Sequence, residues 1–194
     1  MRDVAFCTDA FASPNNTAYS ERVLSALLWA LVYANESWMV AAANGETGDV
    51  VSRGELPLLY QSGVYWEAEK PLGVSACPGG NGQERFLGVR QVLADGKADC
   101  EDLACWRVAE LRLGKPGAMQ MGLPPRPGHP PAKIVPPPWP QEPARDGFDA
   151  VPAFYSRRTG PRSWLYHIVV AWRLPSGGVL LEDPSRQLGM GGRG

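Results

Sequence analysis

A cysteine at the start of a predicted helix is the residue best suited to do chemistry in this sequence. In the segment 96–116 (GKADCEDLACWRVAELRLGKP), Asp99 is a typical first residue of a helix, strong helix formers follow it, and Gly114 is a typical stop. Cys100 therefore falls in the first turn, where unpaired N–H groups and the positive end of the helix dipole stabilise a thiolate. We expect a lowered thiol pKa and a nucleophile near neutral pH.

A thiolate that attacks acyl groups needs an imidazole to carry the proton and a third group to orient that imidazole. Of the two histidines, His129 lies in a proline-rich segment that fixes no geometry, whereas His167 lies within a predicted strand. Asp183 ends the next predicted strand. The catalytic hypothesis is a triad of Cys100, His167 and Asp183.

Each of these residues also has a purely structural interpretation. Cys100 would be a small buried side chain, and His167 a core histidine with satisfied hydrogen bonds. Cys105 lies about 140° around the helix from Cys100, so we interpret it as core packing. The four cysteines contain no C-x-x-C pair and the histidines add no zinc spacing, so we expect neither a metal nor a cofactor.

Apolar periodicity and breaker residues indicate the elements that must position these groups. A short strand is expected at Val4–Thr8 and a largely buried helix from about Ala18 to Asn35, whereas Leu56–Tyr65 fits a strand or a short helix equally well. A β-hairpin is expected from Ser163–Leu174 and Val179–Leu181. A central cysteine helix packed on an antiparallel sheet fits this order.

The hairpin raises a question of register. A symmetric turn around Ser176 and Gly177 would place Asp183 opposite Val170, three positions from His167. A closed triad therefore requires a different register or a β-bulge.

Two segments look separate from the core of this single domain, residues 1–194. Ten prolines among the 21 residues of 123–143 exclude helix interiors and central strands, so we expect an exposed loop or polyproline II insertion. Residues 189–194 hold four glycines and are expected to be a flexible tail.

Composition limits the partners. With 19 basic and 20 acidic side chains and a pI of about 6.1, the chain lacks the excess of positive charge that binding to nucleic acid requires, so we expect no nucleic-acid partner. The longest apolar run, Val23–Ala34, is shorter than the ~20 residues that span a bilayer, so we expect no membrane anchor. No secretory signal is recognisable, so the expected location is the cytoplasm.

Taken together, these motifs resemble the transglutaminase-like cysteine protease superfamily over roughly residues 60–190. The similarity lies in Asp-Cys-Glu-Asp-Leu-Ala opening a helix, a histidine-bearing strand, and Glu-Asp-Pro-Ser after the next strand. The stretches YQSGVYWEAE, CEDLACWRVAELR and DPSRQLGM are most similar to small transglutaminase-like proteins of tailed phages. Cys100 and His167 are 67 positions apart, which is more than a minimal fold of this kind needs, and the proline-rich segment accounts for the excess.

The resemblance implies a papain-like α+β fold with N-terminal helices and a cysteine helix on an antiparallel sheet. It implies that Cys100, His167 and Asp183 form the triad. It also implies an oxyanion held by the backbone N–H of Cys100 and by an upstream side-chain donor, for which Trp66 and Gln91 are the candidates. We favour Trp66, although an indole also fits a core well.

Three functions follow from this resemblance. The first is a cysteine peptidase or amidase acting on a protein or peptide, with phage structural proteins and virion assembly or maturation as the setting. The second is a catalytically silent assembly component of a phage head or tail. The third is an amine-accepting acyltransferase. The expected location is the host cytoplasm or the virion, and the oligomeric state is open.

Overall fold

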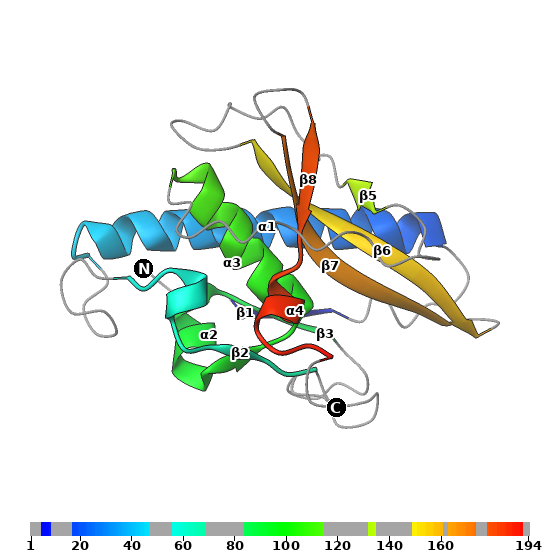
Figure 1. Ribbon diagram of the computed structural model, residues 1–194, viewed down its shortest axis with the longest axis horizontal. Helices are drawn as coiled ribbons and strands as arrows, with labels where there is room; N and C mark the ends of the chain where they lie inside the picture. Colours follow the sequence, from blue (N-terminus) through cyan, green and yellow to red (C-terminus); the bar gives the residue numbers. More distant parts are fainter. Residues whose placement is uncertain are drawn as a thin grey trace.

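The protein has an α+β fold in which two long helices pack against an antiparallel sheet (Figure 1). The computed structural model describes residues 5–8, 17–46, 56–68, 84–114, 132–134, 149–160, 163–173 and 178–191. In chain order its elements are β1 (Ala5–Thr8), α1 (Thr17–Ala43), the 3-10 turn η1 (Leu59–Gln61), β2 (Tyr65–Trp66), β3 (Glu84–Leu87), α2 (Val89–Asp95), β4 (Lys97–Ala98), α3 (Cys100–Arg112), β5 (Lys133–Ile134), β6 (Ala150–Gly160), β7 (Ser163–Arg173), β8 (Val179–Glu182) and α4 (Pro184–Gln187).

The largest sheet has the strand order β5-β6-β7-β8 and is antiparallel throughout. β1 pairs with β3 antiparallel, and β2 pairs with β4 parallel. The predicted hairpin is confirmed as β7 and β8, but the sequence analysis missed β6, which pairs with β7 along its whole length. Pro152 lies inside β6, and a proline there argues against a strand when the sequence is read alone.

Helix α1 is longer than expected. It runs on to Ala43, so the expected end at Asn35 is wrong. No breaker follows Asn35 until Gly45, whose φ of +75° is a left-handed conformation that glycine adopts readily. Asn35 is buried and its Oδ1 accepts the Val89 N–H at 3.0 Å, so the polar side chain serves a contact with α2 within a continuous helix.

The greater length of α1 also removes the length argument against a membrane span. Residues Glu21–Ala43 are long and apolar enough to cross a bilayer, and 44% of that window is buried inside the protein. A core helix of a soluble protein has the same properties, and α1 contributes to both large apolar clusters described below.

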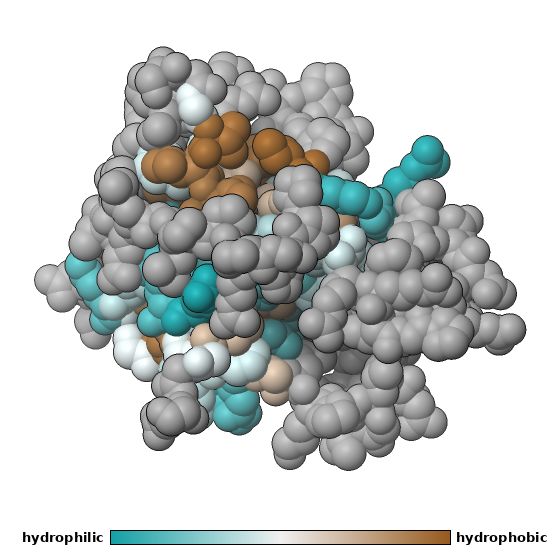
Figure 2. All heavy atoms as spheres, turned by 45° about the vertical axis from the view of Figure 1, so that its right-hand side comes forward, coloured by the Kyte–Doolittle hydropathy of each residue, from teal (hydrophilic) through white to brown (hydrophobic). Residues whose placement is uncertain are grey.

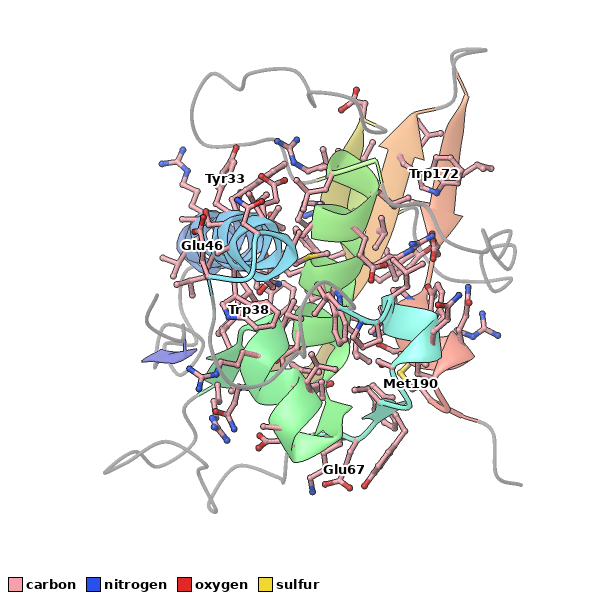
Figure 3. All side chains as sticks on the ribbon, turned by 90° about the vertical axis from the view of Figure 1, so that its left-hand side faces the viewer. Tyr33, Trp38, Glu46, Glu67, Trp172 and Met190 are labelled. Atoms are coloured by element: carbon pink, nitrogen blue, oxygen red, sulfur yellow. The ribbon has the colours of Figure 1, made fainter. Side chains whose placement is uncertain are left out.

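The core lies on both sides of α3. The first cluster joins α1, α3 and the sheet, and its largest members include Trp29, Phe86, Phe154, Ile168 and Trp172. The second joins the end of α1 to α2, η1 and α3, and it includes Trp38, Leu59 and Trp106. Figure 3 shows α3 between α1 and the sheet, with Trp38 below α1 and Trp172 on the sheet side.

Helix α3 is buried along its whole length, from Cys100 to Arg112. An amphipathic helix would have one buried stripe and one open face, whereas α3 has no open face. The charged residues that would have made the open face are inside the protein, Arg107 and Glu110 among them, at 1% and 0% exposure. Such burial requires partners for every charge, and those partners lie next to the candidate site.

A smaller apolar cluster lies on the sheet face that points away from α3. It contains Ala153, Val169 and Ala171, which alternate with the core-facing residues of β6 and β7. In the view of Figure 2, apolar side chains gather in the upper part of the face and polar side chains lie below them.

Most of the predicted proline-rich insertion, 123–143, lies outside the described residues. Within it, Lys133 and Ile134 form the exposed edge strand β5, so this part is neither loop nor polyproline II. Of the predicted tail, residues 192–194 lie outside the described part, and the Met190 N–H donates to the Ser185 carbonyl at 2.8 Å.

Candidate active site

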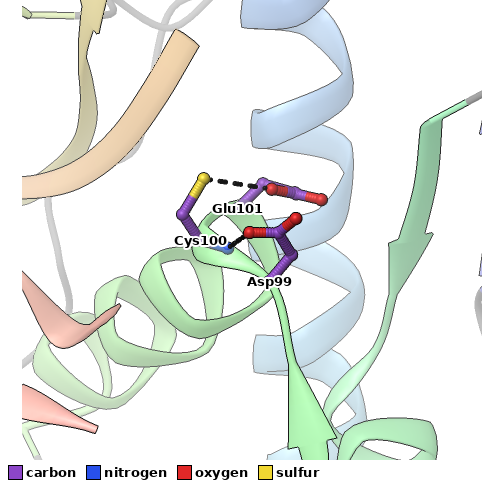
Figure 4. Close-up of side chains that lie close together, drawn as sticks. All are labelled: Asp99, Cys100 and Glu101. Carbon is purple, nitrogen blue, oxygen red and sulfur yellow. Dashed lines mark hydrogen bonds between the residues drawn. The ribbon is translucent and has the colours of Figure 1, made fainter. Parts of the chain in front are cut away.

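The expected start of the cysteine helix is confirmed. Asp99 has an extended backbone and is the N-cap of α3, and its Oδ1 accepts the Cys100 N–H at 2.6 Å. Glu101 and Asp102 follow in the first turn, where carboxylates interact favourably with the helix dipole. Strand β4 ends at Ala98 and leads directly into this turn, so the sheet contact of β4 positions the cysteine (Figure 4).

The surroundings of the Cys100 thiol favour its protonated form. Its Sγ donates to Glu101 Oε2 at 3.3 Å, as the dashed line in Figure 4 shows. Burial raises the thiol pKa well above its ordinary value, and the negative charges of Glu101 and Asp99 raise it further. The nearby Ile168 backbone N–H opposes this rise in the pKa. The expected lowering of the pKa is therefore wrong, because burial and two carboxylates outweigh the helix dipole.

His167 and Asp183 are brought together by the hairpin. The distance from His167 Nε2 to Asp183 Oδ2 is 2.9 Å. Glu182 pairs with Val170, so the next residue, Asp183, comes level with Val169. Val169 is two positions from His167, so Asp183 and His167 lie on the same face of the sheet. A symmetric turn would have placed Asp183 three positions away, so the actual register differs by one residue and brings the carboxylate to the imidazole.

Asp183 has a second partner, because it is also the N-cap of α4. Its Oδ1 accepts the Arg186 N–H at 3.1 Å while its other oxygen faces the imidazole. The ring of Tyr155 stacks on His167 with an interplanar angle of 11° and a centroid distance of 6.4 Å. The imidazole is thus oriented both by a carboxylate and by an aromatic ring.

Cys100 and His167 approach β7 from different sides. Ile168 belongs to the core cluster that contains Cys100, whereas the neighbouring His167 lies on the opposite face with Tyr155. The Ile168 N–H influences the sulfur, so Cys100 lies against the strand segment that carries His167. Among the described residues, the sulfur forms its side-chain hydrogen bond with Glu101 and not with the imidazole.

The two oxyanion candidates have different surroundings. Trp66 aligns with Ala98 in the β2–β4 pair, and its indole Nε1–H donates to Asp99 Oδ1 at 3.3 Å. This places Trp66 beside the N-terminus of α3. The Gln91 amide instead donates to the exposed Asp95 of its own helix at 2.7 Å, so the structure does not bring it to the cysteine.

The sequence analysis missed a buried charge cluster next to this site. The Arg107 guanidinium donates to Glu182 Oε1 at 2.8 Å and to Glu110 Oε2 at 3.0 Å. The Tyr60 hydroxyl also donates to Glu182 Oε1, and Glu110 Oε1 accepts the Leu59 N–H at 2.6 Å. The spacing of Arg107 and Glu110, three residues apart on a helix, was the signal in the sequence that could have indicated the ion pair between these two residues.

Three potential metal ligands meet at the start of α3. One ligand atom from each of Asp99, Cys100 and Glu101 lies within 4.8 Å of the others. The thiol of Cys100 donates a hydrogen bond to Glu101, and the Asp99 carboxylate accepts hydrogen bonds from the Cys100 backbone N–H and the Trp66 indole N–H. These hydrogen bonds account for the cluster without an ion.

No family model, curated protein or solved structure matches the chain.

Proposed function

We propose that the protein is a cysteine hydrolase that cleaves peptide or amide bonds through Cys100, His167 and Asp183. The observation that carries this proposal is the His167–Asp183 hydrogen bond of 2.9 Å, on the strand segment whose next residue, Ile168, contacts the Cys100 sulfur. A histidine oriented by a carboxylate and a cysteine at a helix terminus, here on the two faces of one strand, are the groups that acyl transfer requires.

The arrangement of the elements supports a papain-like core of the transglutaminase-like kind. The cysteine opens the central helix α3, this helix packs on the antiparallel sheet, and the histidine and aspartate come from neighbouring strands or their ends. A protein or peptide substrate, and virion assembly or maturation as the setting, rest on the sequence resemblance alone.

The reaction would proceed in two halves. His167 takes the Cys100 proton, the sulfur attacks the carbonyl carbon, and the carbonyl π electrons move to oxygen. The carbon–nitrogen bond then breaks, the imidazolium gives its proton to the leaving amine, and a thioester remains. Water, deprotonated by His167, attacks the thioester and releases the acid and the free thiol. Asp183 stabilises the imidazolium in both halves.

The described arrangement is a resting state of such an enzyme. The thiol donates to Glu101, so it must turn away from this carboxylate before its proton can pass to His167. Rotation about a single side-chain bond of Cys100 releases Glu101 without moving the helix, and His167, which lies on the opposite face of β7, must also turn toward the sulfur. Catalytic hydrogen bonds commonly tighten only when substrate is bound.

A catalytically silent assembly component is the second candidate. The observation that favours it is the environment of the Cys100 thiol, which is 8% exposed and hydrogen-bonded to Glu101 rather than to His167. In that case the His167–Asp183 pair would serve only to hold β7 against the end of β8.

The test is acylation by p-nitrophenyl acetate, an activated ester that many thiol hydrolases turn over. We expect acetylation of Cys100, detected by peptide mass spectrometry, followed by slow turnover. His167→Ala should reduce acetylation by at least about 100-fold. Cys105 provides the internal control, because it is also buried on the same helix, at 0% exposure against 8% for Cys100, and donates to the Leu28 carbonyl. Equal acetylation of Cys100 and Cys105 would favour the silent component.

A further inference from the structure

We propose that the Asp99 carboxylate occupies the oxyanion-binding position of this site and keeps the protein in a resting state until substrate displaces it. This inference rests on the proposed function, because an oxyanion position has meaning only where an acyl carbonyl is attacked. It assigns to Asp99 a role beyond helix capping.

Two N–H donors from separate parts of the chain converge on one oxygen. Asp99 Oδ1 accepts the Cys100 backbone N–H at 2.6 Å and the Trp66 indole N–H at 3.3 Å. An oxyanion-binding position consists of such a pair of donors directed at one negatively charged oxygen next to the nucleophile. Capping of α3 requires only the helix N–H, so it does not explain the indole.

The indole is held in place by the backbone on both sides of it. The backbone N–H of Trp66 donates to the Leu188 carbonyl at 2.9 Å, and the backbone N–H of the following Glu67 donates to the Ala98 carbonyl at 3.0 Å. Trp66 is therefore anchored between β4 and the end of α4. Of the groups that meet here, the Asp99 side chain can turn about its own torsions, which releases the N–H groups of Cys100 and Trp66 but breaks no hydrogen bond between two backbone groups.

A substrate carbonyl must compete with this carboxylate. When its oxygen enters the site, it needs the same N–H groups of Cys100 and Trp66 that Asp99 now occupies. The carboxylate also opposes a second negative charge on the developing oxyanion. Asp99 must therefore turn away before acylation, and the free energy of substrate binding must drive that rotation.

Two reagents separate this effect from simple thiol reactivity. With p-nitrophenyl acetate, a carbon–sulfur bond forms, the carbonyl electrons move to oxygen, and p-nitrophenolate leaves, so an oxyanion develops. With iodoacetamide, the sulfur displaces iodide at a saturated carbon, so no oxyanion develops. The ratio of acylation to alkylation at Cys100 therefore reports on the oxyanion position and cancels changes in the amount of thiolate.

The experiment measures this ratio in the full-length protein and in Asp99→Ser, where a serine still caps the helix. We expect the ratio to rise about tenfold, because the indole donor becomes available and the negative charge that opposes the oxyanion is removed. Trp66→Phe in the Asp99→Ser background should remove most of the gain. Asp95→Ser is the matched control, since it removes an exposed carboxylate on α2 and should leave the ratio unchanged.

Each outcome decides the question. An unchanged ratio in Asp99→Ser, with Cys100 still acetylated in the unmodified protein, overturns this inference alone. Alkylation of Cys100 without any acetylation in either protein overturns the proposed function and this inference with it. Asp99→Asn keeps the shape and the cap, so it serves if Asp99→Ser does not fold. We expect a smaller rise in its ratio, and a ratio equal to that of the unmodified protein contradicts the inference.

Discussion

Arg107 on α3 and Glu182 at the end of β8 form an ion pair inside the protein, with a distance of 2.8 Å and both side chains 1% exposed. Glu182 directly precedes Asp183, so this pair fastens the strand end that carries the carboxylate to the helix that carries the cysteine. It thereby fixes the spacing between the two parts of the candidate site.

Removing the cation from this cluster should destabilise the fold strongly. Arg107→Ala leaves the Glu182 and Glu110 carboxylates buried without their cationic partner, and we expect the free energy of unfolding to fall by about 3–5 kcal/mol. Urea denaturation measures this loss. Lys97→Ala breaks the solvent-exposed Lys97–Glu67 pair and should leave the denaturation midpoint nearly unchanged. Similar losses in the two variants would contradict the argument.

Glu110 should make stability depend on pH in a defined window. Burial raises its pKa to about 7 from the ordinary value of 4.5, although hydrogen bonds from Leu59 and Arg107 partly oppose the rise. The folded state therefore binds a proton more tightly than the unfolded state. Its contribution to stability is complete below about pH 4.5 and is lost as the pH rises through 7.

The measurement is the free energy of unfolding at pH 5 and pH 7.5. The protein should lose on the order of 1–3 kcal/mol between them through this group. Glu110→Gln keeps an acceptor for Leu59 and cannot titrate, so its pH dependence in this window should be flatter. A variant with the same pH dependence as the unmodified protein would show that other groups are responsible.

Two substitutions at Asp183 should separate its two roles. Asp183→Asn keeps an oxygen that caps α4 but removes the negative charge next to His167, so p-nitrophenyl acetate turnover should fall at least about tenfold. Asp183→Ala removes the cap as well, and the free energy of unfolding should fall by about a further 1 kcal/mol. Thermal denaturation and turnover together test this. A loss of stability in the Asn variant equal to that in the Ala variant would reject the separation.

Glu101 should control the reactivity of the cysteine. Its charge raises the Cys100 pKa and its oxygen holds the thiol proton, so Glu101→Gln should lower that pKa. At pH 8 a larger fraction of thiolate should make Cys100 react faster with iodoacetamide. The rate at Cys105 in the same sample normalises for unfolding, and an unchanged ratio of the two rates would refute the expectation.

Local signals in the sequence were sufficient for the elements that carry the site. Asp99 and Gly114 bracket α3, and the run of β-branched and aromatic residues around His167 forms β7. Such signals act between residues a few positions apart, so they survive without knowledge of the rest of the fold. For the same reason the sequence indicated that His167 lies within one strand of a hairpin and that Asp183 lies at the end of the other.

What the tertiary structure decided is how those elements meet. The register that brings Asp183 to His167 differs by one residue from a symmetric hairpin, and a shift of one residue moves a side chain to the other face of a sheet. The tertiary structure also decided the direction in which the Cys100 pKa shifts. The helix dipole, which favours a lowered pKa, is a local property of α3, and burial outweighs it. Burial is not local, since it depends on α1, the sheet and every other segment packed around the sulfur.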